Sequence, residues 1–224
     1  MAAAFESTFA EEIAHAITHG LGAVLGIIGL LAMLAVAADY GTTAVWTSAV
    51  FGGSVIILYS ASTLYHGVPG NRMPRMKEFF RRFDHAAIYM LIAGTYTPFA
   101  VITLRGSTGW VLFSVVWGLA IIGIIWKVFA SEDRTRLSLA LYLAMGWIGI
   151  LAGKTLFSNL PAGGLWLLLG GGLAYSVGAV FFAWRKLPFN HAIWHLFVLT
   201  GTALHYFAIL YFVLPSAHQL IPHR

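Results

Sequence analysis

The chain contains long stretches of apolar residues that carry almost no charge, and these stretches recur from near the N-terminus to near the C-terminus. A helix needs about 20 mainly apolar residues to cross the roughly 30 Å hydrocarbon layer of a bilayer. The stretches that meet this length cover approximately residues 15–38, 44–66, 84–104, 109–130, 137–157, 164–184 and 190–214. The sequence therefore predicts an all-α polytopic membrane protein, with residues 1–224 forming a single bundle of seven transmembrane helices.

Composition excludes several other classes of protein. Only 9% of the residues are charged, against about 25% in a soluble domain. There is no cysteine, so neither a disulfide framework nor a cysteine-based metal site is available. The first residues lack the basic region of a secretory signal, and we expect the first apolar stretch to remain as a membrane helix. The net charge of +5 arises in short connections between spans, so it does not indicate nucleic-acid binding.

The distribution of Lys and Arg predicts the orientation, because basic residues accumulate in cytoplasmic loops. Most of them fall in connections on the same side as the N-terminus, and few fall on the opposite side. We therefore expect a cytoplasmic N-terminus, an external C-terminus and a multi-pass protein of the cell inner (plasma) membrane. On the N-terminal side lie Arg72, Arg75, Lys77, Arg81, Arg82, Lys127, Arg134, Arg136, Arg185 and Lys186; opposite lie Arg105, Lys154 and Arg224.

Two sets of glycines predict close helix packing. Gly164, Gly171 and Gly178 recur every seven positions, so they share one face of the sixth predicted helix. Gly22 and Gly26 form a GxxxG pattern in the first. Small residues at such positions let a neighbouring helix approach closely.

Ionisable residues within membrane spans are costly and indicate a functional site. In this chain they lie at the starts of the first, third and seventh predicted helices and at the end of the second. With the N-terminus inside, all these positions lie at the cytoplasmic end of the bundle. The ionisable residues are Glu12, His15, His19, His66, Asp84, His85, His191 and His195, and the polar Ser62 lies one turn before His66.

The spacing of two of these histidines favours metal binding. His191 and His195 are at positions i and i+4, which places them on one helix face, one turn apart. With a third histidine from another helix they could hold a zinc ion and leave its fourth position open to water. Zinc lowers the pKa of such a water to about 7. Asp84 lies at the right depth to orient that water or take its proton, and Ser62 could hydrogen-bond beside it.

Each residue also has a purely structural interpretation. Asp84 could cap the third helix, and Ser62 could hydrogen-bond to its own helix. His15 and His19 form a second i, i+4 pair that competes as the metal site. His205 lies roughly 21 Å along the helix axis from His191, so it cannot bind the same ion, and we expect an interhelical hydrogen bond there.

Four motifs together resemble the hemolysin III family, the bacterial branch of the progestin and adipoQ receptors. They are "EEIAHAITHG", "SASTLYH", "FDHAAIYMLIAGTYTP" and "HAIWH", in the family's order along essentially the whole chain. The wider group includes alkaline ceramidases and is regarded as a set of membrane-embedded zinc hydrolases. The resemblance implies zinc held by His66, His191 and His195, with a water near Asp84. It assigns no metal role to His15, where the family often has Asn.

The resulting expectation is a zinc-dependent membrane hydrolase that cleaves an amide or ester in a lipid-like substrate near the cytoplasmic face. The resemblance, rather than the spacing, points to lipid amides. Membrane lipids and a lipid-like small molecule are the expected partners. A cytolysin or pore is the alternative that the family name suggests, although polar residues cluster at one end instead of lining whole helices. A lipid-sensing receptor with structural zinc would be compatible with the same sequence.

Overall fold

The protein is described by a computed structural model covering residues 8–129 and 135–217, in which every regular element is helical. Seven segments are long and apolar enough to cross a membrane, which confirms the predicted number of spans. Four of them continue through short 3₁₀ or π segments. The first four spans are α1 (Phe9–Ala37) with the 3₁₀ turn Ala38–Tyr40, α2 (Thr42–Gly67), α3 (Pro74–Pro98) with the π-helix Phe99–Leu104, and α4 (Gly106–Phe129). The fifth span consists of α5 (Thr135–Trp147), the 3₁₀ segment Ile148–Ala152 and α6 (Gly153–Asn159). The last two are α7 (Ala162–Ala183) and α8 (Asn190–Ala208), which continues through the π-helix Ile209–Val213 into α9 (Leu214–Ser216).

Helix α3 differs from the prediction because it begins at Pro74, in the connection between the predicted spans 44–66 and 84–104. Proline suits the first turn of a helix, where its missing N–H has no partner to lose. Glu78 then pairs with Arg81 and Arg82 at i+3 and i+4 on the helix surface. The charged residues that resemble a loop by composition therefore form the first turns of α3. Two residues of the orientation prediction, Arg134 and Arg224, lie outside the described residues.

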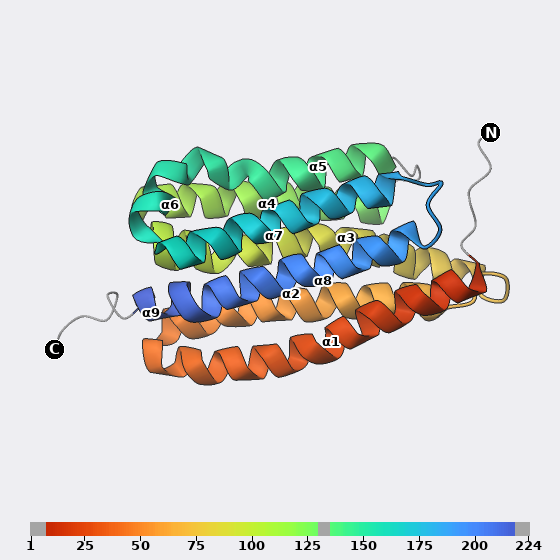
Figure 1. The fold of residues 1–224 in the computed structure, drawn as a ribbon, viewed down its shortest axis with the longest axis horizontal. Coiled ribbons are helices and arrows are strands. Elements are labelled where there is room, and N and C mark those ends of the chain that lie inside the picture. Colours follow the sequence, from red (N-terminus) through yellow and green to blue (C-terminus); the bar gives the residue numbers. More distant parts are fainter. Residues whose placement is uncertain (1–7, 130–134, 218–224) are drawn as a thin grey trace.

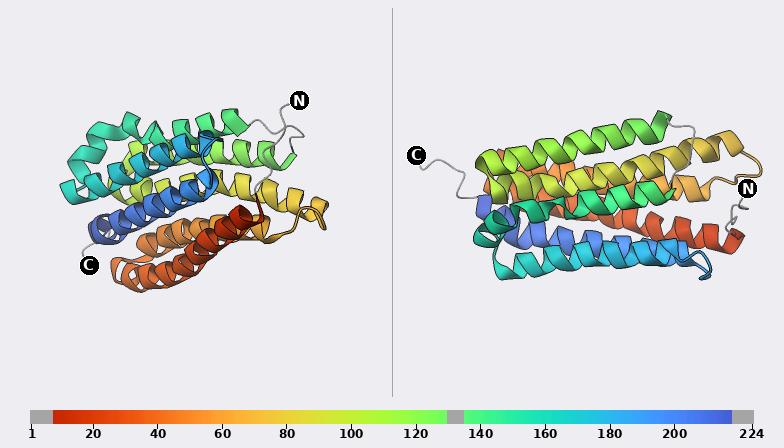
Figure 2. Two further views of the ribbon diagram at one scale, coloured as in Figure 1. Left: turned by 45° about the vertical axis from the view of Figure 1, so that its right-hand side comes forward. Right: turned by 90° about the horizontal axis from the view of Figure 1, so that it is seen from above.

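The spans run along one long axis, and the start of α1 and the short helix α9 lie at opposite ends of the bundle (Figure 1). Rotated views show the same alignment of the helices (Figure 2). The span that contains α3 is the most enclosed, with 72% of its most apolar window buried, against 17% for the span that contains α1. Large apolar side chains of α1, such as Ile17, Leu21 and Leu31, face outward. This outer apolar surface is what a lipid environment requires, and α3 forms the interior wall.

The glycine face of α7 packs against α8, as the sequence predicts. A Cβ atom at Gly164 would lie 2.9 Å from Cβ of Phe212, and one at Gly178 would lie 2.6 Å from Cβ of Phe197. At Gly171 the added atom would collide with His205. Gly22 and Gly26 of α1 likewise leave no room for a side chain, and Tyr59 and Val55 of α2 are among their nearest neighbours. These close approaches hold α8 between α1 and α7.

Candidate metal centre

Short polar contacts fix the beginning of α1 beside the beginning of α8. Thr8 and Glu11 form a capping box at the start of α1. Oε2 of Glu11 takes part in this capping box, and Oε1 accepts a hydrogen bond from the backbone N–H of Phe189 at 3.0 Å. Asn190 then donates to the carbonyl of Phe182 at the end of α7, at 3.0 Å. The histidines in the first turns of α1 and α8 are thereby placed next to each other.

Polar side chains from four helices meet at this end of the bundle. They come from the starts of α1 and α8, the end of α2, and the part of α3 around Asp84. Almost all are buried, although the surroundings are apolar. His15, His19, Ser62, His66, Asp84 and His195 are all at most 6% exposed.

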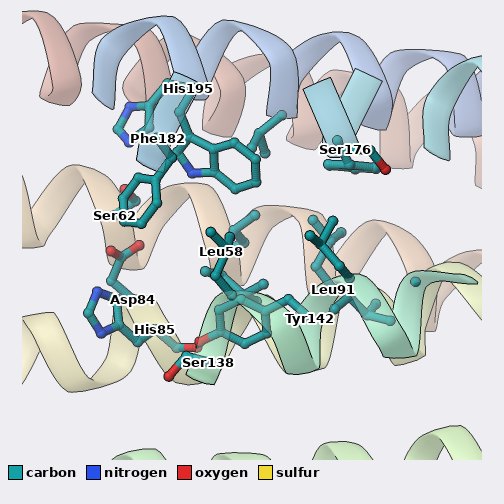
Figure 3. A pocket seen from close by; sticks show the side chains of 18 of the residues that line it. Leu58, Ser62, Asp84, His85, Leu91, Ser138, Tyr142, Ser176, Phe182 and His195 are labelled. Atoms are coloured by element: carbon teal, nitrogen blue, oxygen red, sulfur yellow. The ribbon is translucent and has the colours of Figure 1, made fainter. Parts of the chain in front are cut away.

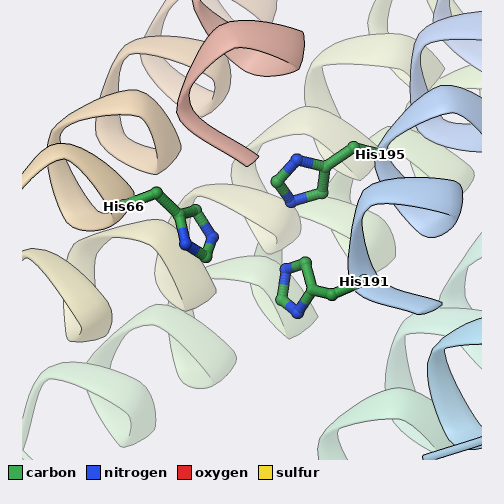
Figure 4. A group of neighbouring side chains, drawn as sticks. All are labelled: His66, His191 and His195. Atoms are coloured by element: carbon green, nitrogen blue, oxygen red, sulfur yellow. The ribbon is translucent and has the colours of Figure 1, made fainter. Parts of the chain in front are cut away.

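Three of the histidines could hold a metal ion. Ligand atoms of His66, His191 and His195 all lie within 4.8 Å of one another. His66 comes from α2, and the other two come from successive turns of α8, with their rings facing the same space (Figure 4). Imidazole nitrogen is a ligand that zinc and several other transition metals accept. The arrangement fits a metal ion of that kind.

Glu12 fixes the orientation of His66. Nδ1 of His66 lies 3.0 Å from Oε2 of Glu12, and the Nζ of Lys77 lies 2.8 Å from the same oxygen. Because an ionised carboxylate only accepts hydrogen bonds, Nδ1 of His66 carries the proton and Nε2 is left with a free lone pair. This Nε2 is buried and has no hydrogen-bond partner among the described residues. A metal ion would satisfy it, and a carboxylate behind a ligating histidine is a common arrangement in metal sites.

Thr18 plays a similar part for His195. The hydroxyl of Thr18 lies 2.8 Å from the carbonyl oxygen of Ala14, to which it donates, and 3.1 Å from Nδ1 of His195. Since a hydroxyl has only one proton, Thr18 accepts from Nδ1–H of His195. The lone pair of His195 is then on Nε2. The contributions of Glu12, Thr18 and Lys77 were not identified from the sequence, because each depends on which helices are neighbours.

Asp84 and Ser62 face each other beside these histidines (Figure 3). Asp84 lies well inside α3, which begins at Pro74, so the interpretation of Asp84 as a helix cap is wrong. Ser62 does not hydrogen-bond to its own helix either, because its hydroxyl contacts no backbone carbonyl of α2 within the described part of the chain, and its polar neighbour is the Asp84 carboxylate. Both structural interpretations of these residues are therefore excluded, and two polar groups remain directed toward the centre of the bundle.

An apolar cavity extends from this polar cluster toward the other end of the bundle (Figure 3). Ser62, Asp84, His191 and His195 line one end of the cavity, and His205 and Ser176 line the other. The walls between them include Leu58, Leu91 and Val198. Residues 195 and 205 are separated by roughly 15 Å along α8. The sequence did not predict this cavity, since its walls come from several helices.

The remaining histidines have different surroundings. His205 lies 3.1 Å through Nε2 from the carbonyl oxygen of Leu168 on α7, which confirms the predicted interhelical hydrogen bond. His19 stacks on His195 with the ring centroids 3.4 Å apart and the planes at 9°. His15 belongs to a second group of possible ligands, together with Glu12 and His66. His19 belongs to neither group of possible ligands among the residues described.

The sequence comparisons assign the family. The model of the family described as "Haemolysin-III related" matches residues 7–206. The chain belongs to this family. It is similar to Hemolysin-3 of Bacillus cereus, with 52% identity over 92% of this chain and 94% of that protein. It is 45% identical to the Hemolysin-3 homolog of Bacillus subtilis (strain 168), over 92% of this chain and 95% of the relative.

More distant similarity extends to animals. The Monocyte to macrophage differentiation factor of Homo sapiens is 30% identical over 98% of this chain and 91% of that protein. The haemolysin-III-related family assignment thus covers all the helices that contribute to the candidate metal centre. It agrees with the resemblance carried by the four motifs.

Proposed function

We propose that this haemolysin-III-related chain is a metal-dependent membrane hydrolase that cleaves an amide or ester bond in a lipid-like substrate. The observation that carries the proposal is the position of Ser62, Asp84 and two histidines, His191 and His195, at one end of an apolar cavity, with His66 close enough to share a metal ion with both. Convergent polar groups in an otherwise apolar pocket are typical of a binding or active site. We place this site near the cytoplasmic face of the plasma membrane, in line with the distribution of basic residues.

Zinc is the proposed metal, with His66, His191 and His195 as its ligands. Glu12 and Thr18 would hold the His66 and His195 rings so that Nε2 of each points to the ion. When bound there, zinc would supply Lewis acidity at the scissile bond and lower the pKa of a nearby water to about 7. Three protein ligands are usual in a catalytic zinc site, and three histidines are one of the known sets.

The other residues would carry out the remaining tasks. Asp84 would accept a proton from the attacking water at a carboxylate oxygen and later deliver it to the leaving amine or alcohol. Ser62 would hydrogen-bond to Asp84 and keep that carboxylate directed at the reacting carbonyl. The apolar walls, including Leu58 and Leu91, would hold a hydrocarbon chain and exclude water from it.

The test uses the full chain purified in lipid nanodiscs. We expect about one zinc ion per chain by elemental analysis, and release of fatty acid from a long-chain N-acyl amide or ester lipid. Asp84→Asn should abolish hydrolysis but keep the metal, whereas His66→Ala and His195→Ala should lose both. Thr200→Ala is the matched control, because Thr200 is an exposed α8 residue whose hydroxyl donates to the Leu196 carbonyl of its own helix.

The outcomes separate the parts of the proposal. Wild-type protein without stoichiometric zinc would contradict the metal assignment. Protein that binds zinc through these histidines but cleaves neither class of lipid would contradict the hydrolase. Retention of full activity in Asp84→Asn would remove Asp84 from its proposed role.

A further inference from the structure

Four histidine rings, not three, surround one point at the start of α8. The ring of His15 lies 4.6 Å, 4.7 Å and 5.4 Å from those of His66, His191 and His195, measured between centroids. The other three pairs are separated by 5.1 Å, 5.3 Å and 4.6 Å. Four imidazoles placed tetrahedrally around zinc, with Zn–N bonds of about 2.0–2.1 Å, have centroids roughly 5 Å apart. All six separations are close to that value.

His15 is buried without a hydrogen-bond partner among the described residues. Its side chain belongs to a residue that is only 1% exposed, and neither Nδ1 nor Nε2 has a hydrogen-bond partner among the described residues. A buried polar group without a partner is unfavourable, and such groups are rare in folded proteins. Among the described residues, the aromatic rings in contact with His15 are those of the three other histidines. A shared metal ion would satisfy a nitrogen of His15 and the unpartnered Nε2 of His66 at once.

The four-histidine arrangement rests on the ring positions, whereas the ligand atoms as they stand group His15 with Glu12 and His66, which could hold a separate ion. That separate ion is disfavoured by what Glu12 already binds. The same oxygen, Oε2, contacts both the ammonium group of Lys77 at 2.8 Å and Nδ1 of His66 at 3.0 Å. The positive charge of Lys77 repels a second cation, and His66 would have to serve two ions. His15 is therefore better placed to join the ion held by the other histidines.

We propose that His15 is a fourth histidine ligand of the metal ion at His66, His191 and His195, so that the ion of the resting protein has four imidazole ligands. The inference rests on the metal of the proposed function but not on hydrolysis. Four protein ligands fill a tetrahedral zinc site and leave no position for water or substrate. His15 would thus control the access of water and substrate to the metal ion. Hydrolysis would require either that His15 leaves the ion or that the ion accepts a fifth ligand.

His19 offers a matched control from the next turn of α1. Its ring is parallel to that of His195 at 3.4 Å, so their in-plane lone pairs run in parallel planes and do not meet at one ion. His19 is buried, and its nitrogens also have no hydrogen-bond partner in the described part of the chain. It therefore reproduces the burial and chemistry of His15 without its placement among the other three rings.

X-ray absorption spectroscopy of the zinc-loaded wild-type protein provides the test that needs no substitution. We expect a first shell of four imidazole nitrogens and one ion per chain. Three imidazoles with an oxygen would overturn the inference, and two ions per chain would instead indicate a separate Glu12–His15 site. Failure to hydrolyse lipids, with four imidazoles present, would overturn the proposed hydrolase alone.

Cobalt-substituted variants give a second readout. His15→Asn should weaken cobalt affinity by at least about 100-fold, the upper end of losses from residues behind a ligand. It should also open a position that azide can occupy, seen as a new visible absorption band. Wild type and His19→Asn should bind cobalt without an azide band. Equal cobalt affinity in His15→Asn and wild type, or an azide band in the wild type, would contradict a fourth ligand.

Discussion

Glu12→Gln is the substitution that most directly tests how the metal centre is held. The carboxylate of Glu12 accepts from Nδ1 of His66 at 3.0 Å and pairs with Lys77 at 2.8 Å. Glutamine has nearly the same shape but no charge, so His66 loses its charged partner and is no longer held in a single tautomer. Lys77 would keep its positive charge beside His66 without compensation. Both changes make His66 a weaker ligand for a cation.

The expected loss follows from comparable sites. Removing a carboxylate behind a ligating histidine reduces metal affinity by about 10–100-fold. This range corresponds to roughly 1.4–2.7 kcal/mol of binding free energy. The carboxylate of Glu12 is mostly sheltered, at 24% side-chain exposure, so solvent screens the interaction only in part. We therefore expect an effect within this range.

The assay is a zinc competition titration on nanodisc-embedded protein, with a chromophoric chelator of known affinity. Glu78→Gln is the control, because Glu78 lies at the same end of the bundle and, among the residues that the structure describes, pairs with Arg81 and Arg82 on the α3 surface. That variant should bind zinc like the wild type. If Glu12→Gln binds zinc with unchanged affinity, the carboxylate does not support a ligand, and our account of the His66 tautomer is wrong.

Three further predictions concern packing, the bundle interior and the pore alternative. Gly178→Ala should lower the free energy of unfolding by about 1–3 kcal/mol, and with it the thermal midpoint, because the added Cβ overpacks against Phe197. Gly118→Ala is the control and should leave both unchanged, because a Cβ there meets no atom within 4 Å. Tyr59→Phe should cost about 1 kcal/mol, because it removes the donor to Thr202 at 2.8 Å; chemical denaturation in detergent would measure it, and an unchanged midpoint would contradict the bond. Vesicles containing the pure wild-type protein should retain an entrapped dye, and leakage that persists after His66→Ala would support a pore instead.

Much of the fold was predictable because the bilayer imposes a length. Seven apolar stretches of that length predict seven spanning helices, without knowledge of how they pack. The first turns of α3 were missed because Arg81, Arg82 and Glu78 stabilise a helix through pairing along its surface, which composition alone does not distinguish from a loop. The glycines of α7 indicated a close neighbour but not that the neighbour is α8.

For the candidate site, the sequence determined which residues share a depth: His66, Asp84 and the pair His191 and His195 follow from helix length and an i, i+4 spacing. Only the tertiary structure decided which of these meet and what stands behind them. Helical periodicity specifies a face but not the neighbour it meets, so the Glu12–His66 contact, the His15 ring among the other histidines and the apolar cavity depend on the order of helices around the bundle. That order is set by side-chain packing between helices, such as the contact of Gly178 with Phe197, because lipid solvates apolar outer faces equally well in any arrangement.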